Sequence, residues 1–177
     1  IDYIRNDIFT NPTDNPLTVE YDIAPISGPG CRGPLQVVVL TVEAQPTVIP
    51  APDEAICSQD PTSITLQSNT VPTSGNVTFS VTVSSSGAVT GFTPVRQNLP
   101  QGFVIDDTPR NLDNTVSTLT YTITPQMFSA KNGVGCTSGT PIVVTVNVEP
   151  EPTLEFSETF ISICDGVRLD DIHNILS

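Results

Sequence analysis

The sequence predicts an all-β protein, and three observations lead to that prediction. Thr, Val, Ser and Pro are abundant, and the 17 prolines are difficult to place in helices. Several segments alternate apolar and polar residues with the period of two that marks a half-buried strand. Turn residues separate these segments at short intervals, which is typical of a Greek-key sandwich.

The expected strands follow from this alternation. The most regular one places Val77, Phe79, Val81 and Val83 on one face, with Thr and Ser on the other. In chain order, we expect strands at residues 64–66, 77–83, 89–95, 103–105, 119–124 and 143–148, with turns at 84–87 and 99–102. Gly and Pro interrupt the segment 89–95, which makes it the weakest strand. The best helical candidate is 169–176, which could form one or two turns.

The same pattern occurs twice in the chain. Tyr21 and Pro25 match Tyr121 and Pro125 at an offset of 100 residues. The same offset pairs Tyr3 with Phe103, Ile4 with Val104, Asp7 with Asp107 and Asn11 with Asn111. Both copies continue through a Gly-Cys pair, a valine-rich strand, a Glu-Pro segment and an Ile-Cys pair. A repeat of about 105 residues has the size of an immunoglobulin-like sandwich.

The phase of the repeat predicts the domain organisation. Residues 1–46 are expected to be the C-terminal strands of one immunoglobulin-like repeat, 47–152 a complete repeat, and 153–177 the first strand or strands of the next. The predicted fold is therefore a tandem array of immunoglobulin-like Greek-key β-sandwiches. We expect a window on a longer polypeptide, because the chain opens in mid-pattern, and we expect no transmembrane segment.

An ordered set of residues carries a resemblance to a known family. With this set the chain resembles the PKD-like, immunoglobulin-like repeats of giant secreted proteins of Bacteroidota, of which the SprB-type gliding-motility adhesins are the best known. The residues are Tyr121, Ile123, Pro125, Gly135, Cys136, Gly139, Pro141, Val144, Val146, Val148, Pro150, Pro152, Ile163 and Cys164. The family usually has Ser-Gly after the Ile-Cys pair, whereas here Ser58-Gln59 and Asp165-Gly166 follow.

The resemblance implies an extracellular protein at the cell surface, associated with the outer membrane. It implies export by the type IX secretion system and a role in surface adhesion and gliding motility. The expected partners are neighbouring repeats of the same chain, the secretion and gliding machinery, and a surface polysaccharide or another adhesion target.

Charge and composition exclude other classes of function. The net charge of −13 and only six basic residues make nucleic acid a poor partner. His173 is the only histidine, and no Ser or Cys lies in a Gly-x-Ser-x-Gly setting, so neither a catalytic triad nor a histidine metal site is expected. We predict no catalytic residues and no enzyme activity.

Four cysteines without metal-type spacing indicate an oxidising compartment. The start of the first strand and the last hairpin loop are expected at the same end of an immunoglobulin-like sandwich, which favours a Cys57–Cys136 disulfide. Cys31 and Cys164 would then pair with neighbouring repeats. A Cys31–Cys57 bond and four reduced cysteines are the alternatives.

Two weaker sites are also predicted. No cofactor is expected apart from calcium, for which carboxylates near the predicted junctions are candidate ligands: Asp53, Glu54, Glu149, Glu151 and Asp165. The loop 126–134 is the part of the closing hairpin that the first copy lacks. Its Met127, Phe128 and Lys131 are the candidates for a contact surface that is specific to this repeat.

The sequence thus predicts a non-enzymatic repeat segment of a large secreted adhesin or stalk. The alternative is a carbohydrate-binding or accessory immunoglobulin-like module of a secreted hydrolase. An exposed row of aromatic side chains would favour that alternative.

Overall fold

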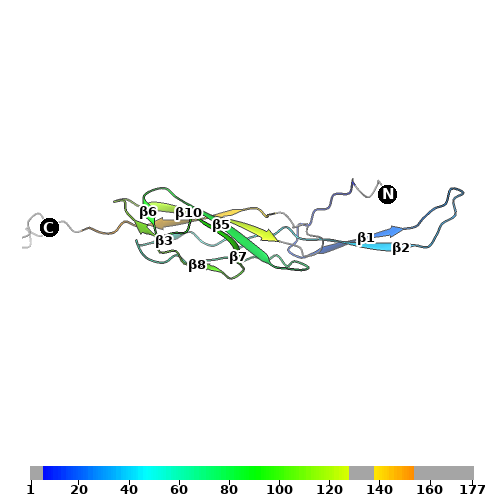
Figure 1. Cartoon of the computed structure of the whole chain (residues 1–177), viewed down its shortest axis with the longest axis horizontal. Coiled ribbons are helices and arrows are strands. Elements are labelled where there is room, and N and C mark those ends of the chain that lie inside the picture. The colour runs from blue at the N-terminus through cyan, green and yellow to red at the C-terminus, as the bar shows by residue number, and fades with distance from the viewer. Residues whose placement is uncertain (1–5, 128–137, 154–177) are drawn as a thin grey trace, which may run out of the picture.

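The computed structural model describes residues 6–127 and 138–153, and these residues form an elongated all-β molecule (Figure 1). All eleven elements are strands, and the described residues include no α-helix. A two-stranded hairpin lies at one end of the long axis, and a larger β-sandwich lies beside it. The predicted all-β fold class is confirmed. No helix in the described residues is long and apolar enough to cross a membrane.

The main sheet of the sandwich has five strands in the order β3-β11-β10-β5-β7. Its bounds are β3 Glu54–Ile56, β11 Ile142–Val148, β10 Ser117–Met127, β5 Val77–Ser85 and β7 Val95–Pro100. Neighbouring strands are antiparallel except β3, which runs parallel to the end of β11. The predicted strands at 77–83, 119–124 and 143–148 lie inside this sheet.

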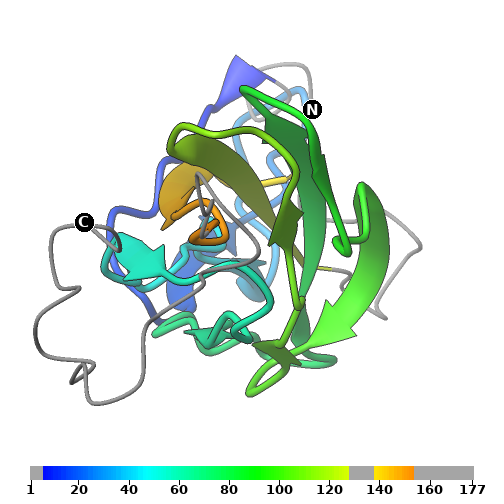
Figure 2. The ribbon, with the colours of Figure 1, turned by 90° about the vertical axis from the view of Figure 1, so that its left-hand side faces the viewer.

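Two short strand pairs form the opposite layer. They join β4 Ile64–Thr65 to β8 Val104–Ile105, and β6 Val89–Thr90 to β9 Arg110–Asn111. Seen along the long axis, the strands surround a central interior (Figure 2), and the apolar residues of the alternating strands fill it. Phe79, Leu119, Tyr121 and Val146 are fully buried there. The face that the alternation assigned to the core is therefore the face that packs.

The predicted strand at 89–95 is not continuous, and the predicted turn at 99–102 begins two residues too early, because the turn occupies residues 101 and 102. Gly91 has a φ of 81°, a left-handed conformation that suits glycine and breaks the strand into β6 and β7. Strand β7 then continues to Pro100 and pairs with β5, although Asn98 has a φ of 55° and the register shifts between Phe79 and Val81. The alternating pattern could not show this irregular edge strand.

The separate hairpin consists of β1 Leu17–Ile23 and β2 Gln36–Val42, paired in regular antiparallel register from Leu17↔Val42 to Ile23↔Gln36. No further strand flanks it in the described residues. The segment that follows β2 turns inward, because Ala44, Pro46 and Val48 are buried where the hairpin meets the sandwich.

Candidate functional site

The most polar feature of the sandwich interior is the carboxylate of Asp107. Arg96 holds it through two hydrogen bonds, of 3.1 Å from Nη1 and 2.5 Å from Nη2. The Tyr121 hydroxyl donates a third hydrogen bond, of 3.1 Å, to the same carboxylate. Burial, and then the negative charge of Asp107, raise the pKa of Tyr121 far above its ordinary value.

The hydrogen-bonding capacity of this cluster is used within the fold. Asp107 also accepts a hydrogen bond from the backbone N–H of Thr93, so both of its oxygens are occupied. A buried charge that is paired and fully hydrogen-bonded is tolerated, whereas an unpaired one is costly. The cluster ties β10 to β7 and to the segment before β9.

The hairpin contains a second version of the same bond. The Tyr21 hydroxyl donates to Asp7 at 2.7 Å, and these residues stand 100 positions before Tyr121 and Asp107. The hydrogen bond to Asp7 raises the pKa of Tyr21. Phe9 packs edge-on against the Tyr21 ring, with 6.4 Å between the ring centroids. Here, however, Asp7 and Phe9 are exposed and Tyr21 is only half-buried.

A pair of asparagines also occupies equivalent places. Asn11 Nδ2 donates to the carbonyl oxygen of Val42 at 2.9 Å, and Asn111 Nδ2 donates to that of Val148 at 2.9 Å. Each of the two carbonyls belongs to the last residue of the second strand of its hairpin. The offsets that the sequence repeat predicted for Asp7 and Asn11 therefore correspond to matching hydrogen bonds.

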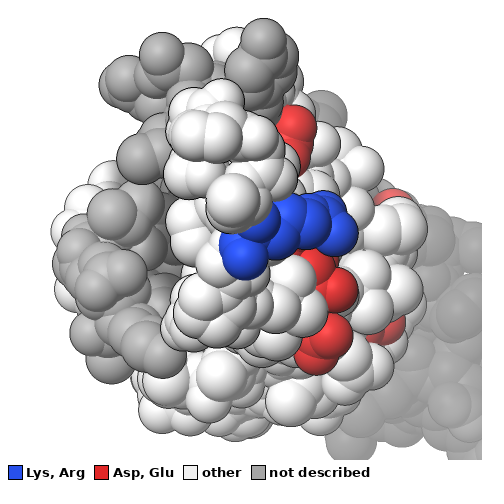
Figure 3. Space-filling model, turned by 90° about the vertical axis from the view of Figure 1, so that its right-hand side faces the viewer, with Lys and Arg blue, Asp and Glu red and all other residues white. Residues whose placement is uncertain are grey.

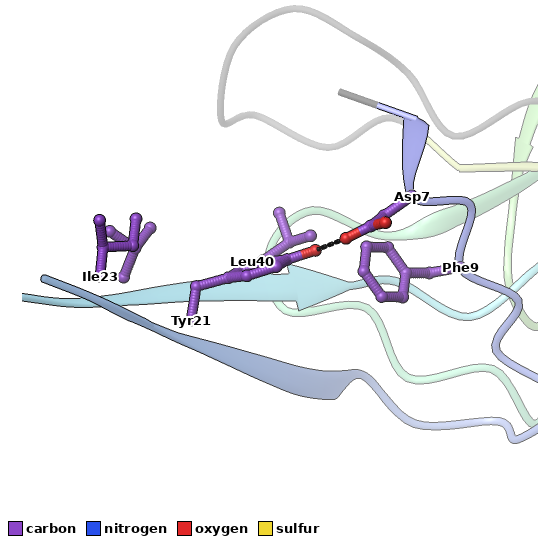
Figure 4. Close-up of a pocket in the computed structure, with 6 residues that line it drawn as sticks. Asp7, Phe9, Tyr21, Ile23 and Leu40 are labelled. Carbon is purple, nitrogen blue, oxygen red and sulfur yellow. Dashed lines mark hydrogen bonds between the residues drawn. The ribbon is translucent and has the colours of Figure 1, made fainter. Parts of the chain in front are cut away.

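The open face of the hairpin forms a hollow of about 280 Å³. Asp7, Phe9, Tyr21, Ile23, Val38 and Leu40 line it (Figure 4). Its lining is apolar except for the Tyr21–Asp7 pair. It is the candidate binding surface of the described residues, because the equivalent face of β10 and β11 is fully covered.

Hydrogen bonds join the hairpin part to the sandwich. The backbone N–H of Val71 donates to the carbonyl of Asp14 at 2.8 Å, and the N–H of Thr73 donates to the Glu43 carboxylate at 3.1 Å. Gly139 packs so closely on Pro46 that a Cβ at Gly139 would collide with the Pro46 carbonyl oxygen. The junction is thus a packed contact and not a free linker.

A second set of contacts holds the chain where it leaves the sandwich. The Glu151 carboxylate accepts hydrogen bonds from Arg110 Nε at 3.1 Å and Arg110 Nη2 at 3.2 Å. Gln59 Nε2 donates to the same carboxylate at 2.5 Å. The hydrogen bonds from Arg110 are the main cause of a lowered pKa of Glu151.

The structure does not gather the predicted calcium ligands. Asp53 accepts a hydrogen bond of 2.7 Å from the N–H of Thr145, which lowers the pKa of Asp53, and Glu54 accepts one from Ser63. Glu151 is paired with Arg110, and Glu149 is exposed. Among the described residues, no group of three His, Cys, Asp or Glu side chains could hold a metal ion. Asp165 lies outside them, and calcium binding stays a prediction.

The predicted contact loop is only partly described. Met127 is the last residue of β10 and is fully buried, so it belongs to the core and not to a contact surface. The alternation of buried and less buried residues continues through Pro125 to Met127. This longer alternating run should have placed Met127 on the core face. Phe128 and Lys131 lie outside the described residues.

Cys31 and Cys57 are exposed and are not bonded to each other. Cys136 and Cys164 lie outside the described residues, so the Cys57–Cys136 pairing stays a prediction. Strand register argues against it: Cys57 follows Ile56, which pairs with Val148 at the far end of β11. Met127 and Ser138, the described residues on either side of the Cys136 loop, lie beyond the opposite end of β11. Seven residues of β11 separate the two ends, roughly 20 Å.

Basic side chains form no broad patch at the hairpin end of the molecule, where basic and acidic atoms lie side by side on a mostly uncharged surface (Figure 3). Two of the described arginines, Arg96 and Arg110, are ion-paired with Asp107 and Glu151. Sequence reasoning missed both pairs, because their partners are 11 and 41 residues apart and no local motif links them.

Comparison with known proteins gives one match. A family model described as a PKD-like domain matches residues 54–152, which include all strands from β3 to β11. No curated protein and no solved structure matches significantly.

Proposed function

The chain belongs to the PKD-like domain family, and from this membership we propose that it is a non-enzymatic segment of a large secreted adhesin or stalk at the cell surface. In this proposal the units stand in tandem, with residues 1–46 ending one unit, 47–152 forming a complete one and 153–177 beginning the next. The chain would serve surface adhesion and gliding motility in a bacterium of the Bacteroidota, after export by type IX secretion.

The observation that carries the proposal is that the two hairpins, β1–β2 and β10–β11, make the same two hydrogen bonds. Tyr21–Asp7 and Asn11–Val42 hydrogen-bond as Tyr121–Asp107 and Asn111–Val148 do. Two hairpins that share both of these hydrogen bonds are expected when one type of unit recurs along the chain.

The packed junction supports a mechanical role. Hydrogen bonds from Val71 and Thr73 to the hairpin part, together with the contact of Gly139 on Pro46, support a fixed direction from one unit to the next. Units joined in this way would form an extended stalk that transmits force and holds a binding tip away from the cell. The Asp107 cluster has no free nucleophile or base, which fits a non-catalytic module.

The alternative, a carbohydrate-binding module of a hydrolase, has less support. Phe92 and Phe103 pack against the core, so they do not form an exposed aromatic platform. Deleting the coding segment from its bacterium separates the two functions. We expect weaker attachment to surfaces and slower gliding with unchanged polysaccharide hydrolysis. Normal attachment with lost hydrolysis would favour the alternative.

A further inference from the structure

The junction between the hairpin part and the sandwich uses three groups of the hairpin part. Two of them accept hydrogen bonds from backbone N–H groups of the sandwich loop 71–73: the carbonyl oxygen of Asp14 at 2.8 Å and the carboxylate of Glu43 at 3.1 Å. The third is the carbonyl of Pro46, on which Gly139 packs. Pro46 is buried in this junction.

The sandwich carries the same three groups at its own exit end, where β11 finishes. The matched hydrogen bonds of Asn11 to Val42 and of Asn111 to Val148 set the correspondence between the two ends. Counting onward from these four residues pairs each exit group with a junction group: Asn114 with Asp14, Glu149 with Glu43, and Pro152 with Pro46. The exit end lies near β3 and β6, opposite the hairpin along the long axis (Figure 1).

At the exit end the three groups face solvent. Asn114, Glu149 and Pro152 are all exposed. Within residues 6–127 and 138–153, no hydrogen bond reaches the Asn114 carbonyl oxygen or the Glu149 carboxylate. Leu112 and Val116, on either side of Asn114, are 56% and 49% exposed. Polar acceptors beside exposed apolar side chains are typical of a surface that another domain covers.

We propose that the exit surface, formed by Asn114, Glu149 and Pro152, is the docking site for a further PKD-like unit. This docking rests on the proposed tandem arrangement and names the contacts that join its units. The incoming unit places its counterpart of loop 71–73 on the Asn114 carbonyl and the Glu149 carboxylate. Its counterpart of Gly139 packs on Pro152, so each unit repeats the junction before it.

The differences between the two ends fall where side chains are not used. Asp14 contributes only its backbone carbonyl to the junction, and its counterpart Asn114 has a different side chain. Glu43 contributes its carboxylate, and its counterpart Glu149 is again a glutamate. A charged acceptor makes a stronger hydrogen bond to an N–H than a neutral one, which favours keeping the carboxylate.

The chain beyond β11 is also held in place before a unit docks. Arg110 binds the carboxylate of Glu151, the residue before Pro152, with 3.1 Å between Nε and Oε1. An ordered exit segment lowers the entropy that docking must remove.

A tandem chain tests the docking: residues 1–152 followed by residues 47–177, which keeps at the joint the Pro-Thr step that follows both β2 and β11. The two copies are isotope-labelled separately for NMR. The Thr73 amide of the first copy is bonded to Glu43, and that of the second copy should be bonded to Glu149. We expect similar hydrogen-exchange rates for the two Thr73 amides, and relaxation rates that show both copies tumbling as one body.

A matched pair of variants, made in the first copy alone, locates the contact. Glu149→Ala is expected to speed exchange of the second Thr73 amide about tenfold and to leave the first unchanged. Glu20→Ala should change neither, because Glu20 is exposed on β1 at the other end of the molecule (Figure 1). Both side chains are exposed, so both variants should keep the melting curve of the sandwich.

Independent tumbling of the two copies, an unprotected second Thr73 amide, or equal effects of Glu149→Ala and Glu20→Ala would overturn this docking. Protection that grows with protein concentration would also overturn it, because the contact would then join separate chains. None of these results bears on attachment or gliding, so the proposed function stands or falls by the deletion experiment.

Discussion

The Tyr121 hydroxyl lies 3.1 Å from the Asp107 carboxylate in the interior of the sandwich, and the Tyr21 hydroxyl lies 2.7 Å from Asp7 on the open hairpin. The first bond is buried and the second is exposed, so comparing them measures how much burial adds to the stability that such a hydrogen bond contributes. We expect Tyr121→Phe to lower the free energy of unfolding by about 1–3 kcal/mol, because Asp107 loses a buried partner. Tyr21→Phe should change it by less than about 0.5 kcal/mol.

Urea unfolding of both variants checks this prediction. The stronger change is Arg96→Leu, which leaves Asp107 buried without its counter-charge and should cost about 3–5 kcal/mol. Equal effects of Tyr121→Phe and Tyr21→Phe would contradict the stabilising role assigned to the buried cluster.

The contact of Gly139 with Pro46 gives a second prediction. In Gly139→Ala the new methyl group meets the Pro46 carbonyl oxygen and the Pro125 ring, so backbone must move at the junction. We expect a loss of about 1–3 kcal/mol and a broader distribution of hairpin orientations. Gly28→Ala is the control, because nothing lies within 4 Å of the added Cβ. Thermal melts measure the loss of stability, and small-angle scattering measures the distribution of hairpin orientations. An unchanged melting temperature for Gly139→Ala would mean that the junction accommodates the added methyl group without loss of stability.

A buried hydroxyl offers a stabilising change. Thr78 Oγ1 in β5 is buried and has no hydrogen-bond partner among the residues that the structure describes. Replacing it in Thr78→Val removes an unsatisfied polar group at almost constant volume, and valine suits a strand. We expect the free energy of unfolding to rise by about 1 kcal/mol. In the control Thr118→Val, the lost hydroxyl donates to Asn147 at 2.9 Å, so stability should fall or stay constant.

Alternation along single strands carried most of the fold prediction. Leu119, Tyr121 and Ile123 were assigned to one face, and all three are buried. That signal needs only the local chain, because neighbouring side chains of a strand point to opposite faces. It failed at residues 89–102, where a glycine with positive φ and a bulge redirect an edge strand, and at Met127, where the predicted loop is still strand.

Site prediction was poorer, because the polar contacts join distant parts of the chain. The offset of 100 residues correctly aligned Asp7 with Asp107, yet it gave no reason to place Arg96 beside the carboxylate. Calcium binding by the carboxylates near the junctions stays a prediction, and nothing in the sequence indicated that Asp53 accepts a hydrogen bond from a backbone N–H and Glu151 from a guanidinium. Such pairings follow from strand order, which spacing along the sequence does not reveal.

The Glu151 contact predicts an acid-sensitive exit from the sandwich. Its pKa is lowered below the usual 4.5, so the folded state favours the charged form. The stabilisation is therefore complete above pH 4.5 and is lost as the pH falls through the lower, folded-state pKa. We expect the Arg110 Nε–H signal in NMR spectra to lose its shift and exchange protection over that acid range. Glu151→Gln should give the unpaired Arg110 signal already at neutral pH. An Arg110 signal that does not change as the pH falls would disprove the ion pair in solution.

The positions of Cys57 and of the residues that flank the loop of Cys136 predict the disulfide pattern. Cys57 lies past the Val148 end of β11, whereas Met127 and Ser138, the described residues that flank the loop of Cys136, lie past the Ile142 end. A disulfide needs Cα atoms within about 7 Å, far less than the roughly 20 Å length of β11. We therefore expect bonds between adjacent units and no Cys57–Cys136 bond within one. Non-reducing peptide mapping of the oxidised chain tests this, with Cys57→Ser as the control. Recovery of a Cys57–Cys136 peptide from folded protein would require β3 to leave β11, and would restore the bond that the sequence favoured.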